Sequence, residues 1–170
     1  MDHRARVQAK GLREKFGDDF FFMRTGWRPT GCLPLLQICW MREENPDLLE
    51  KVERFAFVRD YITYKLSGEW ATDPSSAGIT MLYNLEKGVW DGELLELAGI
   101  TKSQLPTITD SGKYVGDVIP SLGRELGFRN VVSVSNGGHD QYCASLGAGA
   151  MGEGDLLLSG GTAWVLLLTS

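Results

Sequence analysis

Apolar positions in the first third of the chain recur with the spacing of helices. Residues 2–16 are rich in strong helix formers and Gly17 follows them, which predicts a first helix that stops there. Residues 33–44 place apolar side chains on one face, and Thr30 is the expected cap of this second helix. Pro46 ends it, because a proline disfavours helical geometry in the residue before it, and begins a further short helix.

The middle of the chain predicts short elements separated by turns. Residues 56–60 favour a strand, and residues 71–78, with the sequence ATDPSSAG, have turn chemistry. Helices are expected over 60–70 with Gly68 near the end, over 88–100 between Asp91 and Gly99, and over 116–128.

The last forty residues are the most regular part of the pattern. The β-branched run 130–135 predicts a buried strand, the glycine turn 136–140 follows it, and the small-residue stretch 141–150 predicts a helix. Two apolar runs over 155–169 are expected to pair as strands through a two-residue turn at Gly160-Gly161. Helices interleaved with a few strands indicate an α/β fold.

Composition narrows the classes of partner. The chain has 170 residues, of which 43% are hydrophobic, and 17 basic against 22 acidic side chains give a formal net charge of −5. A basic face for nucleic acid or an anionic membrane is therefore not expected. The charged start of the chain is unlike a signal peptide, and no apolar run approaches the ~20 residues that span a bilayer.

Cysteine and histidine are too sparse for a disulfide framework or a metal site. The cysteines are Cys32, Cys39 and Cys143, without a CxxC pattern, and the histidines are His3 and His139. We expect reduced thiols that pack as small hydrophobes in a cytoplasmic protein, and no metal ligands in this chain.

Asp140 is the first candidate for chemistry. It follows a strand and a turn with two glycines, and it falls in the first turn of the expected helix, where the helix dipole stabilises a carboxylate. Open α/β sheets bind ligands at the carboxyl ends of their strands. Aspartate is also a preferred N-terminal cap, and the residues alone favour this capping interpretation over a functional one.

The expected hairpin is the second candidate. Gly160 and Gly161, bounded by Ser159 and Thr162, place backbone N–H groups and hydroxyls in one turn, which could hold a phosphate. A plain hairpin remains the favoured interpretation of Gly-Gly alone.

Two further patterns carry less weight. The glycines of residues 147–152 spell GxGxxG, but a helix precedes them and a strand follows, so a dinucleotide site is rejected. The side chains of Thr72, Asp73, Ser75 and Ser76 are expected to satisfy amides of a structural turn.

In order along the chain, these segments resemble the FGGY carbohydrate kinases. The resemblance rests on DHRA near the start, PLLQICWMREENPDL, the block VRDYITYKLSGEWATDPSSAGITMLYNLEKGVWD, then GGHDQ and LSGGTAW. It covers essentially the whole chain. The last two motifs are weak individually. Their order and spacing, together with the segment TDPSSA at residues 72–77, carry the resemblance.

The resemblance implies a fold and a reaction. The expected fold is part of a ribonuclease-H-like, actin-like ATPase domain: residues 1–150 would be the later part of the sugar-binding domain, and 151–170 the first hairpin of the ATP-binding domain. The reaction would be ATP-dependent phosphorylation of a sugar or polyol, with a ketose such as xylulose favoured. The expected partners are thus a small sugar and ATP, and the full-length form could be a homodimer.

The family's site residues transfer by position. Asp140 would be the general base, Gln141 would bind the sugar, and His139 would touch substrate or merely pack. Gly160, Gly161 and Thr162 would contact phosphates of ATP, and the main ligands of Mg²⁺ are expected outside this chain.

Parts of the family's pattern are missing. The first phosphate loop, the upstream sugar-binding residues and the adenosine motif are absent, so we expect the chain alone to be inactive. Two alternatives stay open: a truncated, non-catalytic protein of the same fold with at most weak sugar binding, and an unrelated α/β binding domain.

Overall fold

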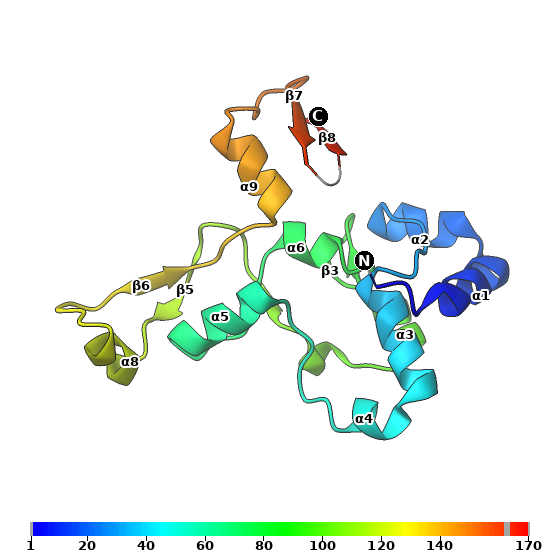
Figure 1. Cartoon of the computed structure of the whole chain (residues 1–170), viewed down its shortest axis with the longest axis horizontal. Coiled ribbons are helices and arrows are strands. Elements are labelled where there is room, and N and C mark those ends of the chain that lie inside the picture. Colours follow the sequence, from blue (N-terminus) through cyan, green and yellow to red (C-terminus); the bar gives the residue numbers. More distant parts are fainter. Residues whose placement is uncertain (1, 162–163, 170) are drawn as a thin grey trace. The chain divides into compact units, whose positions relative to one another are not determined.

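A computed structural model describes residues 2–161 and 164–169 (Figure 1). The chain forms two compact units, Met1–Gly137 and Gly138–Ser170. The hydrophobic core belongs to the first unit, and the second consists of a helix and a β-hairpin. The boundary between the units falls inside the glycine turn that leads to Asp140.

The first unit is built from short helices and pairs of short strands. Its helices are α1 (Arg6–Phe16), α2 (Asp18–Thr25), α3 (Pro34–Glu44), α4 (Pro46–Glu50), α5 (Val58–Ser67), α6 (Pro74–Gly78), α7 (Gly92–Ala98) and α8 (Pro120–Glu125), with a 3-10 helix at Lys102–Gln104. Its strands are β1 (Ala71–Thr72), β2 (Tyr83–Asn84), β3 (Val89–Trp90), β4 (Thr107–Ile108), β5 (Tyr114–Asp117) and β6 (Ser133–Ser135). Strand β1 pairs with β4 in parallel, and β2 with β3 and β5 with β6 are antiparallel.

The core of this unit forms around α3, which packs against both α1 and α7. Leu35 and Leu36 of α3 and Leu94 of α7 are fully buried, as is Phe21 of α2. Burying an aliphatic or aromatic side chain of this size contributes roughly 1.5–3 kcal/mol. Apolar contacts among these helices therefore stabilise the first unit.

The predicted helix ends at glycine are confirmed. Helix α1 ends at Gly17, α5 at Gly68 and α7 at Gly99, and their φ angles of 78°, 82° and 74° lie where a side chain would be strained. Asp91 caps α7, as expected, by accepting hydrogen bonds from two backbone amides of its first turn.

Other local predictions are wrong. Thr30 does not cap α3; Leu33 holds that position and its side chain makes no capping bond. Residues 56–60 form no strand, because α5 already begins at Val58. Helix α2 was not expected, since its apolar residues are consecutive rather than spaced along one face. The turn at 71–78 contains a short strand and a helical turn, β1 and α6.

The last strand of the first unit differs from expectation in burial. Strand β6 covers only Ser133–Ser135 and pairs with β5, which occupies the start of the stretch expected to be helical. Only Val134 of β6 is buried, while Val131 before it is 78% exposed. A run of β-branched residues indicates extended backbone, but it does not reveal what covers that backbone.

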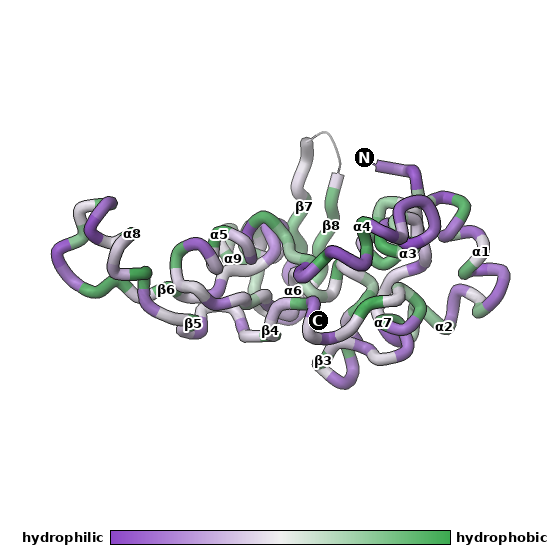
Figure 2. The backbone as a smooth tube through the Cα atoms, turned by 90° about the horizontal axis from the view of Figure 1, so that it is seen from below, coloured by the Kyte–Doolittle hydropathy of each residue, from purple (hydrophilic) through white to green (hydrophobic). Residues whose placement is uncertain are grey.

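The second unit contains α9 (Asp140–Gly147) and the hairpin of β7 (Leu156–Gly160) and β8 (Trp164–Leu168). Gly160 pairs with Trp164, so residues 161–163 connect the two strands along the chain. The prediction of a two-residue turn at Gly160-Gly161 is therefore wrong. Strand β8 is hydrophobic along most of its length (Figure 2), yet alternate side chains of both strands are exposed.

Two further properties bear on earlier expectations. Among the described residues, no helix combines the length and apolar character that crossing a membrane requires. Burial raises the pKa of the Cys39 thiol to about 11, so this cysteine packs as a neutral side chain.

Candidate functional site

Asp140 is the first residue of α9, and its carboxylate is open to solvent. Its side chain is 82% exposed, and Oδ1 accepts a hydrogen bond of 2.7 Å from the backbone N–H of Gln141. The Nδ1 atom of His139 lies 3.2 Å from the same oxygen. His139 occupies the N-cap position, so Asp140 lies in the first turn of the helix, as expected, and is not its capping residue.

The backbone conformation of the turn before Asp140 does not require a glycine at its first glycine position, Gly137. Gly137 lies outside the positive-φ region that favours glycine. A methyl group on Gly137 would instead lie 3.5 Å from Cδ and 3.7 Å from Nη1 of Arg59. The neighbouring arginine, rather than the backbone angle, limits the size of a side chain there.

The hairpin places its predicted phosphate-binding residues only in part. Gly160 ends β7, and a methyl group there would meet the indole ring of Trp164 at 3.7 Å. Gly161 follows the strand, and Thr162 lies outside the described residues. The described part of this loop is therefore the end of a strand and one residue beyond it.

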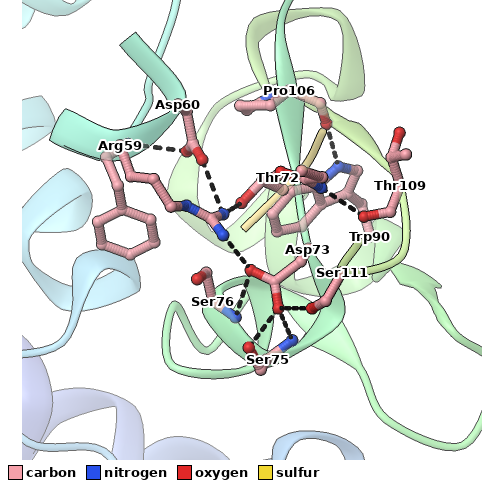
Figure 3. Close-up of polar contacts among 12 residues, drawn as sticks. Arg59, Asp60, Thr72, Asp73, Ser75, Ser76, Trp90, Pro106, Thr109 and Ser111 are labelled. Carbon is pink, nitrogen blue, oxygen red and sulfur yellow. Dashed lines mark hydrogen bonds and ion pairs between the residues drawn. The ribbon is translucent and has the colours of Figure 1, made fainter. Parts of the chain in front are cut away.

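A buried ion cluster lies in the first unit, and the sequence indicated two of its members, Thr72 and Asp73, only as turn residues. Arg59 projects from α5 between two carboxylates and a hydroxyl (Figure 3). Its Nη1 donates to Asp73 Oδ1 at 2.5 Å, and its Nη2 donates at 3.0 Å to both Asp60 Oδ1 and Thr72 Oγ1. The arginine side chain is 26% exposed, against 2% for Asp60 and 0% for Asp73. One guanidinium thus serves two buried carboxylates.

Asp73 joins this cluster to a helical turn and a loop. Its carboxylate accepts bonds from the N–H groups of Ser75 and Ser76 at the start of α6, and from the hydroxyls of Ser75 and Ser111. Burial acts to raise the pKa of Asp73, but the serine bonds and the charge of Arg59 outweigh it and lower the pKa to about 2. The expected capping role of Asp73 is confirmed, and its ion pair adds a tertiary role.

Asn136, the first residue of the glycine turn, is tied to the loop that carries Ser111. Its N–H donates to Lys113 O at 2.8 Å, and its carbonyl accepts from Gly112 N–H at 2.8 Å. Its Nδ2 donates to Thr109 O at 2.5 Å. Asn136 is 4% exposed, so this end of the turn is both buried and held by hydrogen bonds.

An apolar cavity of about 270 Å³ lies beside the cluster. Asp60 and Thr72 line it together with apolar side chains that include Ile38, Phe57 and Trp90. Trp90 donates its indole N–H to Pro106 O at 3.0 Å, which satisfies the polar atom of this wall (Figure 3). Asp60 and Thr72 direct polar atoms to Arg59, so the cavity is left largely apolar.

The described residues do not fit a metal centre. Across 2–161 and 164–169, no three histidine, cysteine, aspartate or glutamate side chains come together as ligands. The carboxylates of the buried cluster are satisfied by a guanidinium and by N–H and O–H donors. No step of a reaction is therefore assigned to a metal held by this part of the chain.

The position of Arg59 had a faint signal in the sequence. The two aspartates of the cluster lie near the ends of the block VRDYITYKLSGEWATD, one after Arg59 and one after Thr72. The block also contains Lys65 and Glu69, so the sequence hinted at a pair only by placing Arg59 next to Asp60, and charged residues are rarely buried unless they are paired. The expectation of a strand at 56–60 hid it, because a strand would not have aimed the side chain at Asp73.

Comparison with known proteins identifies the fold. The structure superposes on xylulose kinase from Lactobacillus acidophilus with a TM-score of 0.91 at 23% identity, covering 97% of this chain and 34% of that one. For xylulose kinase from Rhodospirillum rubrum the TM-score is 0.90 at 26% identity, with the same coverage. The chain therefore has the fold of part of an actin-like, ribonuclease-H-like ATPase, as the resemblance implied.

Sequence comparison extends this result. Xylulose kinase of Bacillus subtilis is 30% identical over 166 residues, which is 98% of this chain and 33% of the relative. Glycerol kinase of Thermus brockianus is 34% identical over 177 residues, covering 100% of this chain and 34% of the relative. The chain thus spans about a third of the length of these relatives. Residues 1–147 match the N-terminal domain of the FGGY family of carbohydrate kinases, and the chain belongs to that family.

Proposed function

We propose that this chain supplies the sugar-binding part of an ATP-dependent carbohydrate kinase, with Asp140 as the general base. The carrying observation is the exposed carboxylate of Asp140 in the first turn of α9, in a chain of the FGGY family. Catalysis of phosphoryl transfer depends mainly on positioning and charge stabilisation, and one group must take the proton of the acceptor hydroxyl.

In the proposed step, Asp140 would accept the proton of a sugar hydroxyl as that oxygen bonds to the γ-phosphorus of ATP, while the bond from this phosphorus to the bridging oxygen breaks and ADP leaves. The N–H of Gln141 and the imidazole of His139 lie at Oδ1, which leaves Oδ2 for the substrate. The side-chain amide of Gln141 would bind the sugar, and its Oε1 accepts no hydrogen bond among the described residues. His139 would help to orient the carboxylate.

We assign residues 1–150 to the sugar-binding domain and 151–170 to the start of the ATP-binding domain. In that second part Gly160, Gly161 and Thr162 would contact phosphates of ATP. When bound, ATP supplies the phosphoryl group, and Mg²⁺ supplies charge neutralisation from ligands elsewhere in a longer protein. A ketose such as xylulose is the favoured substrate, because a xylulose kinase is among the sequence relatives and xylulose kinases recur among the structural neighbours.

A chimera provides the test. The 170 residues replace the matching segment of the Bacillus subtilis xylulose kinase. ADP release is measured with xylulose, glycerol, L-fuculose and gluconate, the compounds for which similar kinases are named. We expect sugar-dependent turnover that falls by about 10²–10⁴ in Asp140→Asn, the usual contribution of a general base. Turnover that survives this change unaltered contradicts the base assignment, and a folded chimera without turnover contradicts the kinase role.

The isolated chain tests whether the site is complete. We expect no turnover from the 170 residues with any of the four sugars, because the chain spans only 33% of the xylulose kinase that it matches. Robust turnover would show that these residues suffice. The alternative of a non-catalytic protein of the same fold predicts an inactive chimera as well as an inactive chain.

A further inference from the structure

Five residues form a closed ring of contacts between the buried ion cluster and the glycine turn. Arg59 pairs with Asp73, and Asp73 accepts a bond of 3.1 Å from the Ser111 hydroxyl. The loop 109–113 around Ser111 makes three hydrogen bonds with Asn136. Gly137 follows Asn136, and a methyl group added to it would lie 3.5 Å from Arg59 Cδ, so its backbone lies near Arg59 and completes the ring. We call Arg59, Asp73, Ser111, Asn136 and Gly137 the Arg59 ring.

The ring links segments that local structure would not join. Ser111 lies 38 residues from Asp73, and Asn136 lies 27 residues from Thr109, its side-chain acceptor. Thr109 N–H also donates to Thr72 O at 2.9 Å, so the loop is fixed to β1 as well (Figure 3). Every contact of the ring lies within the first unit, which ends at Gly137.

Arg59 has the chemistry to hold such a ring in one arrangement. Its planar guanidinium donates in fixed directions to three acceptors, and a lysine ammonium in its place could not reach all of them in the same geometry. A buried ion pair contributes little net stability compared with an apolar replacement. The ring is therefore better explained by what it positions than by the stability it adds.

We propose that Arg59 is a positioning residue for phosphoryl transfer, because its ring fixes the backbone at Asn136 and Gly137, which precede Asp140 in the chain by four and three residues. This inference rests on the proposed role of Asp140 as the base. A catalytic carboxylate must be held within a fraction of an ångström of its productive place, and a small misplacement lowers the rate without weakening substrate binding.

The test compares Arg59→Lys with Arg24→Lys. Arg24 is a matched control, since its side chain is 29% exposed and lies 3.9 Å from Asp91, a second capping aspartate. Amide hydrogen exchange of the 170-residue chain is measured for both variants. We expect exchange at Asn136 and Gly112 to rise about tenfold or more in Arg59→Lys and to stay unchanged in Arg24→Lys.

Ser111→Ala breaks the ring at another point and leaves Arg59 in place. We expect it to raise the same two exchange rates about threefold, since one hydroxyl bond is lost. If Arg59→Lys fails to fold, this variant decides the exchange test alone. Unchanged rates in both ring variants, or equal changes in Arg24→Lys, would overturn the inference.

Kinetics of the chimera supply a readout that a purely structural role would not move. We expect kcat to fall about tenfold in Arg59→Lys, with the KM for sugar and the KM for ATP close to those of Arg24→Lys. A normal kcat alongside raised exchange would show that the ring does not position the base. An unaltered turnover in Asp140→Asn refutes the base assignment separately, and the exchange test then still decides whether Arg59 fixes the turn.

Discussion

Two aspartates of the first unit begin short helices in the same manner but stand in different surroundings. Asp73 and Asp91 are 0% and 7% exposed, and each carboxylate accepts bonds from two backbone amides of the following turn. Arg59 lies 2.5 Å from Asp73, whereas Arg24 lies 3.9 Å from Asp91. Asp91 is completed by a neutral donor, Asn84 Nδ2, at 2.8 Å.

The difference separates a local function from a tertiary one. An aspartate that only caps needs amides two and three residues along the chain, and its sequence context is enough to place it. An aspartate that also pairs with a distant arginine fixes two segments relative to each other. Asp73 does both, and the second function connects it to the turn that precedes Asp140.

The largest expected effect on stability comes from neutralising each of the two aspartates while keeping a side chain that can cap the helix. Asparagine caps helices about as well as aspartate. We expect Asp73→Asn to lower the free energy of unfolding by about 3 kcal/mol, because Arg59 loses its shortest partner in a buried place. Asp91→Asn should cost under about 1 kcal/mol. Urea unfolding measures both, and equal losses would contradict the distinction.

Acid pH should reveal the same contrast. The pKa of Asp73 is lowered to about 2 from 3.8, so its ionised form is favoured in the folded chain. Its contribution of about 2 kcal/mol is complete above about pH 5 and is lost as the pH falls through 3.8 towards 2. We expect the free energy of unfolding to fall less between pH 5 and pH 2 in Asp73→Asn than in Asp91→Asn. Parallel declines would refute it.

A double-mutant cycle sharpens the comparison at smaller energies. Thr72 Oγ1 accepts from Arg59 Nη2 at 3.0 Å, and Thr72→Val removes that acceptor with little change of shape. We expect a loss of about 1 kcal/mol, and a coupling of similar size with Arg59→Lys. The same change combined with Arg24→Lys should be additive. Coupling to Arg24 would mean that the two aspartate sites are not independent.

The contrast also explains which parts of the molecule were readable from sequence. Gly68, Gly99 and the Asp91 cap were predicted because each depends on a few adjacent residues. The first-turn position of Asp140 was found in the same way. The family resemblance rested on the order of such local motifs, so it too was accessible.

The tertiary part of the site was not readable. Arg59 pairs with a residue 14 positions away. Because a strand was expected where α5 begins, the sequence did not predict that the Arg59 side chain points toward Asp73. The β-branched run 130–135 predicted a buried strand, and the burial was wrong because it depends on the elements packed against the strand. The hairpin turn was placed one residue early because Gly-Gly matches a two-residue loop, while Gly160 still pairs within the ladder.

The smallest expected effect tests whether Gly137 is a glycine for reasons of backbone or of space. Its φ is not positive, and a methyl group there would make ordinary contacts of 3.5 and 3.7 Å with Arg59. We expect Gly137→Ala to change the free energy of unfolding by less than about 0.5 kcal/mol, because the lost chain freedom of the unfolded state offsets any crowding.

Gly31→Ala is the matched control for that substitution. Gly31 also lacks a positive φ, but a methyl group there would lie 2.8 Å from the backbone nitrogen of Arg6, which cannot move without shifting the start of α1. We expect a loss of about 1–3 kcal/mol in this variant. If Gly137→Ala were as costly, the Arg59 side chain would have to be as immobile as a helix backbone. A large loss of stability in Gly137→Ala would then be the strongest evidence that the Arg59 ring is rigid.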